Sequence, residues 1–268
     1  MKADLTIGLV AGRGELPFEV IPGIRAQGAR AVVIALAGEA APNLADLADE
    51  YVEIAAGQLG SIIQALTERG VSELVMAGKV GKTALFNGGV DPTFLQLLSK
   101  LPQKNDDAIL LAIVEEFERH GMRVAKQTQY LEHLLAPVGT LFGEPTGAEA
   151  TDLQLGFRMA KASGGLDIGQ SVVVKSGVIL AVEAIEGTDQ AILRGGALGG
   201  PGAVVVKVSK PEQDERFDVP TVGLTTLNSM IEVQATVLGI EAGKTLMIQK
   251  EEMLKTAARN GIKIVSLQ

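Results

Sequence analysis

The 268-residue sequence has no cysteine and no tryptophan, and only 3% of its residues are aromatic. The absence of cysteine excludes disulfides, thiolate nucleophiles and cysteine-ligated zinc or iron–sulfur centres. Few aromatic side chains are present to stack on nucleic-acid bases, and the formal net charge of −8 disfavours a phosphate backbone as a partner. We therefore expect no nucleic-acid partner.

Long apolar runs are also missing. None approaches the roughly 20 residues that a membrane-spanning helix needs. The first apolar run is interrupted at Gly8 and Gly12, which predicts a β-strand rather than a signal peptide. We expect a cytoplasmic protein, and the composition leaves contact with a membrane surface open.

What the sequence does contain is apolar residues, at 47% of the chain, enough for a substantial core. In the first half, β-rich runs alternate with helical spacing, which predicts a mostly parallel, doubly wound sheet. The expected strands are 5–11, 31–36, 51–55, 73–77 and 123–126, and the expected helices lie near 18–24, 59–69, 92–98 and 106–120.

The second half changes character after a stretch rich in Pro and Gly at 135–150, which we interpret as a linker. A mixed α/β pattern follows, with a hairpin across Ser176-Gly177 and a short helix that Thr188 caps and Gly195-Gly196 ends. Further helices are expected at 149–162, 227–237 and 250–260, and strands at 203–208, 246–249 and 262–267. The predicted domains are therefore a Rossmann-like domain at 1–134, the linker, and a mixed α/β domain at 151–268.

The most charged stretch lies between two prolines in the last quarter of the chain. Asp214, Arg216 and Asp218 occupy every second position, so in an extended chain they would share one face. Two carboxylates around one guanidinium suit a divalent metal with a phosphate. The alternative is a solvated loop whose charges pair with one another.

Glycines mark a second candidate site. The spacing Gly8-x3-Gly12-x-Gly14 is typical of short-chain dehydrogenases. The Tyr-x3-Lys pair that those enzymes require is absent, because the residue four places after Tyr51 is Ala55 and the residue four places after Tyr130 is Leu134. Hydride transfer is therefore excluded. A phosphate contact at this turn and a plain tight turn remain open.

Two segments, Lys79 to Thr83 and Gly243-Lys244-Thr245, resemble part of a Walker A loop. The glycine that the full pattern needs upstream is replaced by Met76 and by Leu238, so neither segment is a P-loop. Lys79 and Lys82 still follow a predicted strand, where doubly wound folds bind ligands, and we expect a phosphate contact there.

Three carboxylates, Glu183, Glu186 and Asp189, follow the predicted hairpin. They could add metal or water-orienting ligands to those of the acidic stretch. Helix capping by Thr188 with exposed acids around it is the alternative.

Four segments in order resemble the LpxI family of UDP-2,3-diacylglucosamine pyrophosphatases of lipid A synthesis. The first three segments are Gly8-Leu-Val-Ala-Gly12-Arg-Gly14-Glu-Leu-Pro17, Val75-Met-Ala-Gly78-Lys79-Val and the run from Lys175 to Asp189. The most specific is Lys210-Pro-x-Gln213-Asp214-x-Arg216-x-Asp218-x-Pro220-x-x-Gly223.

The resemblance implies a hydrolase dependent on Mg²⁺ or another divalent cation. It would cut UDP-2,3-diacylglucosamine into UMP and 2,3-diacylglucosamine 1-phosphate (lipid X), with water attacking the β-phosphorus and the substrate in a chamber between the two domains. The implied partners are this acylated nucleotide-sugar and, transiently, the inner face of the inner membrane. The oligomeric state stays open.

The site residues that we expect follow from the motifs and the resemblance together. The catalytic residues are Asp214, Asp218 and Arg216, and the metal ligands are Asp214, Asp218, Glu186 and Asp189. The substrate contacts are Gly12, Arg13, Gly14, Lys79, Lys207, Gln213 and Thr188. The alternatives are a non-catalytic protein that binds nucleotide-sugars or acyl lipids, and a pyrophosphatase for a soluble nucleotide-sugar.

Overall fold

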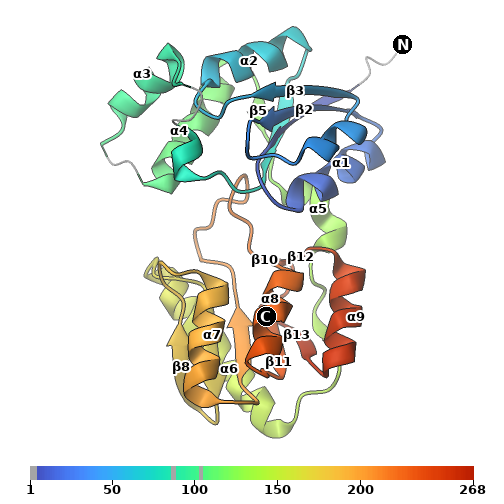
Figure 1. The fold of residues 1–268 in the computed structure, drawn as a ribbon, viewed down its shortest axis with the longest axis vertical. Coiled ribbons are helices and arrows are strands. Elements are labelled where there is room, and N and C mark those ends of the chain that lie inside the picture. Colours follow the sequence, from blue (N-terminus) through green and yellow to red (C-terminus); the bar gives the residue numbers. More distant parts are fainter. Residues whose placement is uncertain (1–4, 86–88, 103–104) are drawn as a thin grey trace. The chain divides into compact units, whose positions relative to one another are not determined.

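The computed structural model describes residues 5–85, 89–102 and 105–268. The chain divides into two compact units (Figure 1). The first comprises the chain up to Leu131 together with Glu215–Phe217, and the second comprises Glu132–Asp214 and Asp218–Gln268.

The first unit contains a five-stranded parallel sheet in the order β3-β2-β1-β4-β5. Its strands are β1 Thr6–Ala11, β2 Arg30–Leu36, β3 Glu50–Ile54, β4 Glu73–Ala77 and β5 Arg123–Val124. The central strands are apolar almost without interruption because helices bury both of their faces. The predicted doubly wound parallel sheet is confirmed.

Helices cover the two faces of this sheet (Figure 1). Contacts place α1 Leu16–Ala26 and α5 Thr128–Leu131 together on one face. The other face carries α2 Leu59–Glu68, α3 Pro92–Lys100 and α4 Asp106–Arg119. Short 3₁₀ turns at Pro42–Asp46 and Lys82–Leu85 follow β2 and β4.

The strand order creates a topological switch between β1 and β4. From β1 the chain goes through α1 to β2 on one side, whereas β4 pairs with β1 on the other side. The carboxyl ends of these two strands therefore border the crevice in which doubly wound folds bind ligands.

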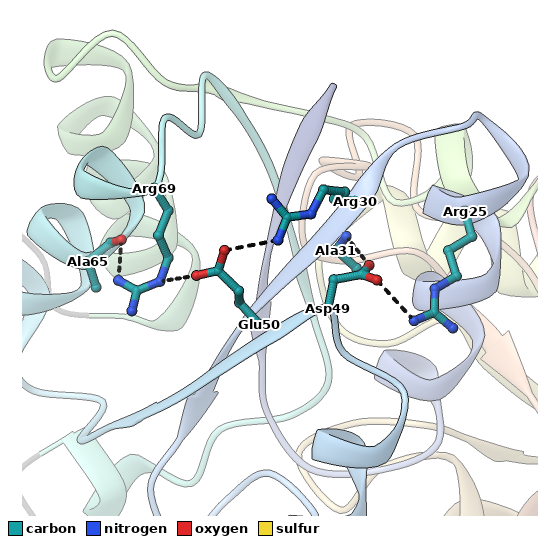
Figure 2. Close-up of polar contacts among 7 residues, drawn as sticks. All are labelled: Arg25, Arg30, Ala31, Asp49, Glu50, Ala65 and Arg69. Atoms are coloured by element: carbon teal, nitrogen blue, oxygen red, sulfur yellow. Dashed lines mark hydrogen bonds and ion pairs between the residues drawn. The ribbon is translucent and has the colours of Figure 1, made fainter. Parts of the chain in front are cut away.

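The opposite, amino edge of the sheet carries ion pairs that hold the strands (Figure 2). Glu50 pairs with Arg30 at 3.1 Å and with Arg69 at 3.0 Å. Asp49 accepts the backbone N–H of Ala31 at 2.8 Å, and this hydrogen bond lowers the pKa of the Asp49 carboxyl. These charges secure the starts of β2 and β3.

The second unit contains a six-stranded mixed sheet in the order β6-β13-β11-β9-β7-β8 and a parallel pair of β10 with β12. The strands are β6 Gly139–Phe142, β7 Ser171–Lys175, β8 Val178–Val182, β9 Val204–Lys207, β10 Thr221–Val222, β11 Val237–Glu241, β12 Leu246–Met247 and β13 Lys263–Leu267. Strands β9, β11 and β13 are parallel, so their carboxyl ends share one edge.

Helices lie on both faces of this sheet (Figure 1). α6 Gly147–Gly165 covers one face, over the valines of β7 and β9. α7 Thr188–Gly199, α8 Leu224–Glu232 and α9 Lys250–Asn260 pack in succession on the other face. The predicted mixed α/β second half is confirmed.

The stretch that we predicted to be a linker belongs to the second unit. Within it, β6 pairs antiparallel with β13, and α6 already begins at Gly147. Its glycines and prolines surround a short edge strand, and turns of this kind have the same composition as a linker. The prediction of a 135–150 linker is therefore wrong.

Two further predictions for the second unit are corrected. Thr188 is the first residue of α7, not its cap, because Gly187 occupies the N-cap without a side-chain bond. The helix continues through Gly195-Gly196 to Gly199. The region predicted as helix 227–237 contains the end of α8 and the start of β11.

Candidate functional site

The carboxyl edge of the first unit brings together Gly12, Arg13, Gly14 and Lys79, which we predicted as substrate contacts. Arg13 and Lys79 exchange two backbone hydrogen bonds, at 2.8 and 2.9 Å. These bonds join the turn after β1 to the turn after β4, at the topological switch. The structure thus brings these residues to one edge of the sheet, and their role as substrate contacts stays a prediction.

Glycine at position 12 is required by this close approach. A Cβ atom there would lie 2.5 Å from the carbonyl oxygen of Lys79, which belongs to the backbone and cannot rotate away. Gly14 has a φ of +100°, a conformation that favours glycine as the chain turns towards α1. The glycine spacing noticed in the sequence thus allows the turn after β1 to lie directly against the backbone that follows β4.

A carboxylate partly neutralises the cations at this edge. Glu39, in the loop after β2, contacts Nε of Arg13 at 2.8 Å and accepts the backbone N–H of Gly81 at 3.0 Å. Glu39 is mostly buried, whereas the Arg13 side chain is 57% exposed. The edge therefore presents an oriented arginine beside an exposed Lys79, a combination suited to a phosphate.

The second unit places a buried polar cluster beside the end of β9, made of Ser171, Glu183, Thr188 and Lys207. Lys207 donates to the Thr188 hydroxyl at 3.1 Å and to the Thr221 carbonyl at 3.0 Å. Thr188 donates its only hydroxyl hydrogen to Glu183 at 2.9 Å. Ser171 must then be the donor in its 3.2 Å bond with Thr188.

This cluster joins two residues that we predicted as substrate contacts, Thr188 and Lys207. The Thr188 hydroxyl is already engaged by three neighbours, so it orients the Lys207 ammonium group rather than offering a free donor. Sequence reasoning assigned no role to Ser171, which is the first residue of an apolar strand and gave no signal of its own.

The acidic loop, defined here as Ser209–Asp218, follows directly after this cluster. It is not extended, because the backbone N–H of Asp218 donates to the Asp214 carbonyl at 2.9 Å. The prediction that three charged side chains share the face of an extended chain is therefore wrong. The turn instead brings the backbones of Asp214 and Asp218 together through this hydrogen bond.

The middle of the acidic loop belongs to the first unit. Phe217 packs against the core beneath α2–α4, and Arg216 lies 3.4 Å from Glu118 of α4. Glu215 pairs with Lys126 at 3.0 Å, and its carbonyl accepts the Gln127 backbone N–H. Asp214 and Asp218 are thus the residues immediately before and after a segment anchored in the first unit.

Gln213, another predicted substrate contact, is used inside the loop. Its Oε1 accepts the Ser209 hydroxyl at 3.0 Å and the Lys210 backbone N–H at 2.9 Å. Its Nε2 is buried and has no hydrogen-bond partner among the described residues. A buried amide donor of this kind is the part of Gln213 that suits a ligand oxygen.

The predicted set of four metal-binding carboxylates does not form one site. Among the residues that the structure describes, no three His, Asp or Glu side chains are grouped in a way that could hold a metal ion. Glu186 accepts Arg194 at 2.5 Å, a hydrogen bond that lowers the pKa of Glu186, and Asp189 lies in the first turn of α7. Asp214 and Asp218 remain as oxygen donors, and Mg²⁺ commonly takes one or two carboxylates together with substrate phosphates and water.

Three further side chains that the sequence motifs did not single out hold these loops. They are Glu39, described above, and Lys161 and Glu241, which contact the backbone carbonyl and N–H of Ser209. Glu39 follows the apolar strand β2, and Glu241 is the last residue of β11. A single acidic residue at the carboxyl end of an apolar strand is the sequence feature that could have identified them. Lys161 lies within α6 and has no such feature.

Together, the fold and its polar clusters define a class: two-unit α/β proteins whose carboxyl edges carry groups suited to phosphate chemistry. Two family models cover nearly all of the chain: LpxI N-terminal domain matches residues 6–134 and LpxI C-terminal domain matches residues 137–265. The chain belongs to the LpxI family. One curated relative, UDP-2,3-diacylglucosamine pyrophosphatase LpxI of Caulobacter vibrioides (strain ATCC 19089 / CIP 103742 / CB 15), is 32% identical over 278 residues, which cover 97% of each chain.

Solved structures are less similar. A biotin carboxylase domain of a single-chain bacterial carboxylase aligns with a TM-score of 0.30 and 16% identity, over 60% of this chain and 35% of that one. The biotin carboxylase subunit of a pyruvate carboxylase gives a TM-score of 0.29 and 16% identity, over 73% of this chain and 42% of that one. The chain thus spans less than half of either structure, and TM-scores this low support no statement about fold or function.

Proposed function

We propose that this chain hydrolyses UDP-2,3-diacylglucosamine to UMP and 2,3-diacylglucosamine 1-phosphate, a step of lipid A synthesis. The observation that carries the proposal is membership of the LpxI family along both domains, with a relative of that name over 97% of the chain. The acidic loop supplies the chemistry that such a reaction needs.

In the proposed reaction, a water oxygen attacks the β-phosphorus. The bond between this phosphorus and the bridging anhydride oxygen breaks, and UMP leaves with that oxygen. Asp214 or Asp218 accepts the proton of the attacking water or orients it. Lys207, held by Thr188 and the Thr221 carbonyl, stabilises charge on the phosphate oxygens.

The divalent cation is part of the proposal. Mg²⁺ would be held by Asp214 and Asp218 together with substrate oxygens, and when bound it would neutralise pyrophosphate charge. Arg216, Gln213 and the first unit's Gly12, Arg13, Gly14 and Lys79 are proposed as further substrate contacts.

We also propose a cytoplasmic location with peripheral contact at the inner face of the inner membrane, since the substrate carries two acyl chains. None of the helices in the described ranges combines the length and apolar character needed to cross a bilayer. Apolar side chains available for surface contact lie on two loops of the second unit: Leu166, Ile168 and Ile185 are 73%, 52% and 101% exposed.

Substitution of the two aspartates tests the catalytic assignment. Asp214→Asn and Asp218→Asn keep the side-chain shape and remove the charge, so we expect kcat to fall by roughly 10²–10⁴ for the aspartate that handles the proton. The melting temperature should stay near that of the wild type. Full turnover in both variants would remove these residues from the mechanism.

Phosphorus NMR in water enriched in ¹⁸O tests the reaction itself. With UDP-2,3-diacylglucosamine and Mg²⁺, we expect the label on the lipid phosphate, because water attacks the β-phosphorus. Label on UMP would retain the hydrolase and overturn this direction of attack. Binding without products would overturn the proposed enzyme in favour of a binding protein.

A further inference from the structure

Lys161 of α6 and Glu241 at the end of β11 form an ion pair at the carboxyl edge of the second unit. The Lys161 ammonium group lies 3.0 Å from each oxygen of the Glu241 carboxylate. Both side chains are mostly shielded from water, at 33% and 14% exposed. Neither residue belongs to the acidic loop or to the segments that resembled the family.

This pair holds both backbone groups of one residue, Ser209. The Ser209 N–H donates to Oε2 of Glu241 at 2.8 Å, and the Ser209 carbonyl accepts Nζ of Lys161 at 2.9 Å. Ser209 follows the buried Val208 at the end of β9 and is the first residue of the acidic loop. The direction in which the chain leaves the sheet is therefore set by two side chains from other elements.

Ser209 also connects this pair to the rest of the acidic loop. The Ser209 hydroxyl and the Lys210 N–H both donate to Oε1 of Gln213, the residue immediately before Asp214. A rotation of the Ser209 peptide would break these bonds and shift Asp214. Displacements of about 1 Å in a reacting group can reduce turnover by roughly 10²-fold.

We propose that Glu241 and Lys161 are positioning residues that hold the acidic loop in its active geometry. The proposal rests on the proposed function, since it concerns the placement of the same aspartates. Both residues act through Ser209 and Gln213, and neither contacts the reacting atoms.

Glu241→Gln disrupts this arrangement with almost no change in shape. The carboxylate accepts from two donors, Lys161 and the Ser209 N–H. A glutamine offers one acceptor oxygen and one donor NH₂ group. Because the Lys161 ammonium group lies 3.0 Å from both positions, the NH₂ group faces this donor in either orientation of the amide. Lys161→Met removes the ammonium group, whereas Lys161→Arg retains a cation that can bridge the carboxylate and the carbonyl.

The chain offers a matched control in Glu149 and Lys263. Nζ of Lys263 lies 2.8 and 2.6 Å from the two Glu149 oxygens, and the Thr146 N–H donates to the same carboxylate at 2.7 Å. Glu149 is 14% exposed, as Glu241 is. This pair joins the start of α6 to the start of β13, away from the carboxyl edge.

The experiment compares kcat and KM for UDP-2,3-diacylglucosamine hydrolysis in the four variants. We expect Glu241→Gln and Lys161→Met to lower kcat at least about tenfold with KM changed less than about threefold, as expected for displaced catalytic groups. Lys161→Arg should recover most of the loss, and Glu149→Gln should keep the wild-type kcat. Equal kcat in Glu241→Gln and Glu149→Gln would overturn the proposal. If Glu241→Gln fails to fold, the comparison of Lys161→Met with Lys161→Arg decides in the same way.

Hydrogen–deuterium exchange provides a readout that does not depend on turnover. The amides of Ser209, Lys210 and Asp218 are hydrogen-bonded within the acidic loop or to Glu241, so their exchange should rise in Glu241→Gln and not in Glu149→Gln. Unchanged exchange at 209–218 would overturn the positioning role. If the wild type is inactive but exchange at 209–218 rises in Glu241→Gln and not in Glu149→Gln, the proposed function is overturned. The conclusion that Glu241 and Lys161 hold the acidic loop then still stands.

Discussion

At the scale of single residues, Glu149 illustrates how one carboxylate links distant parts of the second unit. It completes a capping box with Thr146, accepts the Thr236 hydroxyl and pairs with Lys263. Burial raises the pKa of Glu149, but the hydrogen bonds from Lys263, Thr146 and Thr236 outweigh it and lower the pKa to about 2. The carboxylate is therefore needed in its charged form.

The stability of the wild type should accordingly depend on pH through this residue. The pKa of Glu149 falls from an ordinary 4.5 to about 2 on folding, so its contribution is present above pH 4.5 and is lost as the pH falls towards 2. Urea unfolding at pH 7 should show Glu149→Gln to be about 2 kcal/mol less stable than the wild type. The difference should shrink steadily below pH 4.5, and a difference independent of pH would contradict this account.

At the scale of elements, α7 is placed by glycines that allow close approach. A Cβ on Gly195 would lie 2.7 Å from Cβ of Val173 in β7, and one on Gly196 would lie 2.2 Å from Cβ of Val233, just after α8. These contacts let one helix touch both the sheet and its neighbouring helix. The sequence suggested that the Gly195-Gly196 pair ends the helix, whereas the close contacts explain why glycines occupy these positions inside it.

Alanine at Gly196 should therefore destabilise the protein although alanine favours helices. The gain in helix propensity is about 1 kcal/mol, but overpacking against the rigid, β-branched Val233 should leave a net loss of about 1–3 kcal/mol. Gly165→Ala at the end of α6 is the control, because its nearest atom would be 3.9 Å away. That variant should match or slightly exceed the wild type in thermal unfolding. A Gly196→Ala variant as stable as the control would exclude the steric explanation.

At the scale of the whole molecule, the chain passes between the two units three times, after Leu131, after Asp214 and after Phe217. Two of these passages flank the short segment Glu215–Phe217, whose phenylalanine packs against the first unit's core. The two candidate catalytic aspartates, Asp214 and Asp218, are thus the last residue before this segment and the first residue after it.

The proposed membrane contact is a whole-molecule property that the exposed side chains make testable. The loops that carry Ile168 and Ile185 lie close together, since the Gln170 N–H donates to Glu183 at 3.3 Å. Burying one such side chain contributes about 1.5–3 kcal/mol. Ile185→Ser should therefore reduce flotation with phosphatidylethanolamine–phosphatidylglycerol vesicles at least about fivefold.

Leu198→Ser supplies the control for this measurement. Leu198 is 68% exposed on the last turns of α7, at the other end of that helix from Ile185, and its replacement should leave flotation near the wild-type level. Equal losses for the two variants would indicate nonspecific adsorption rather than contact through the loops.

Much of the fold and part of the site could be predicted from local sequence. Apolar runs of five to seven residues located most strands. The helix expected at 250–260 has these bounds in the structure, where Gly261 ends it in the left-handed conformation. The first unit's Gly12, Arg13, Gly14 and Lys79 were predictable together because parallel strands bring their carboxyl ends to one edge. These features depend on residues close in sequence or on the regular geometry of a sheet.

Other features were decided by tertiary structure because they depend on partners far along the chain. β6 looked like a linker until β13, more than a hundred residues later, provided its hydrogen bonds. The acidic loop looked extended, but Phe217 packs against the first unit's core and the loop turns, with the Asp218 N–H bonded to the Asp214 carbonyl. The contact of Glu241 and Lys161 with Ser209 likewise joins three elements. The apolar pattern determined the strands, whereas long-range burial and hydrogen bonding determined where the charged side chains lie.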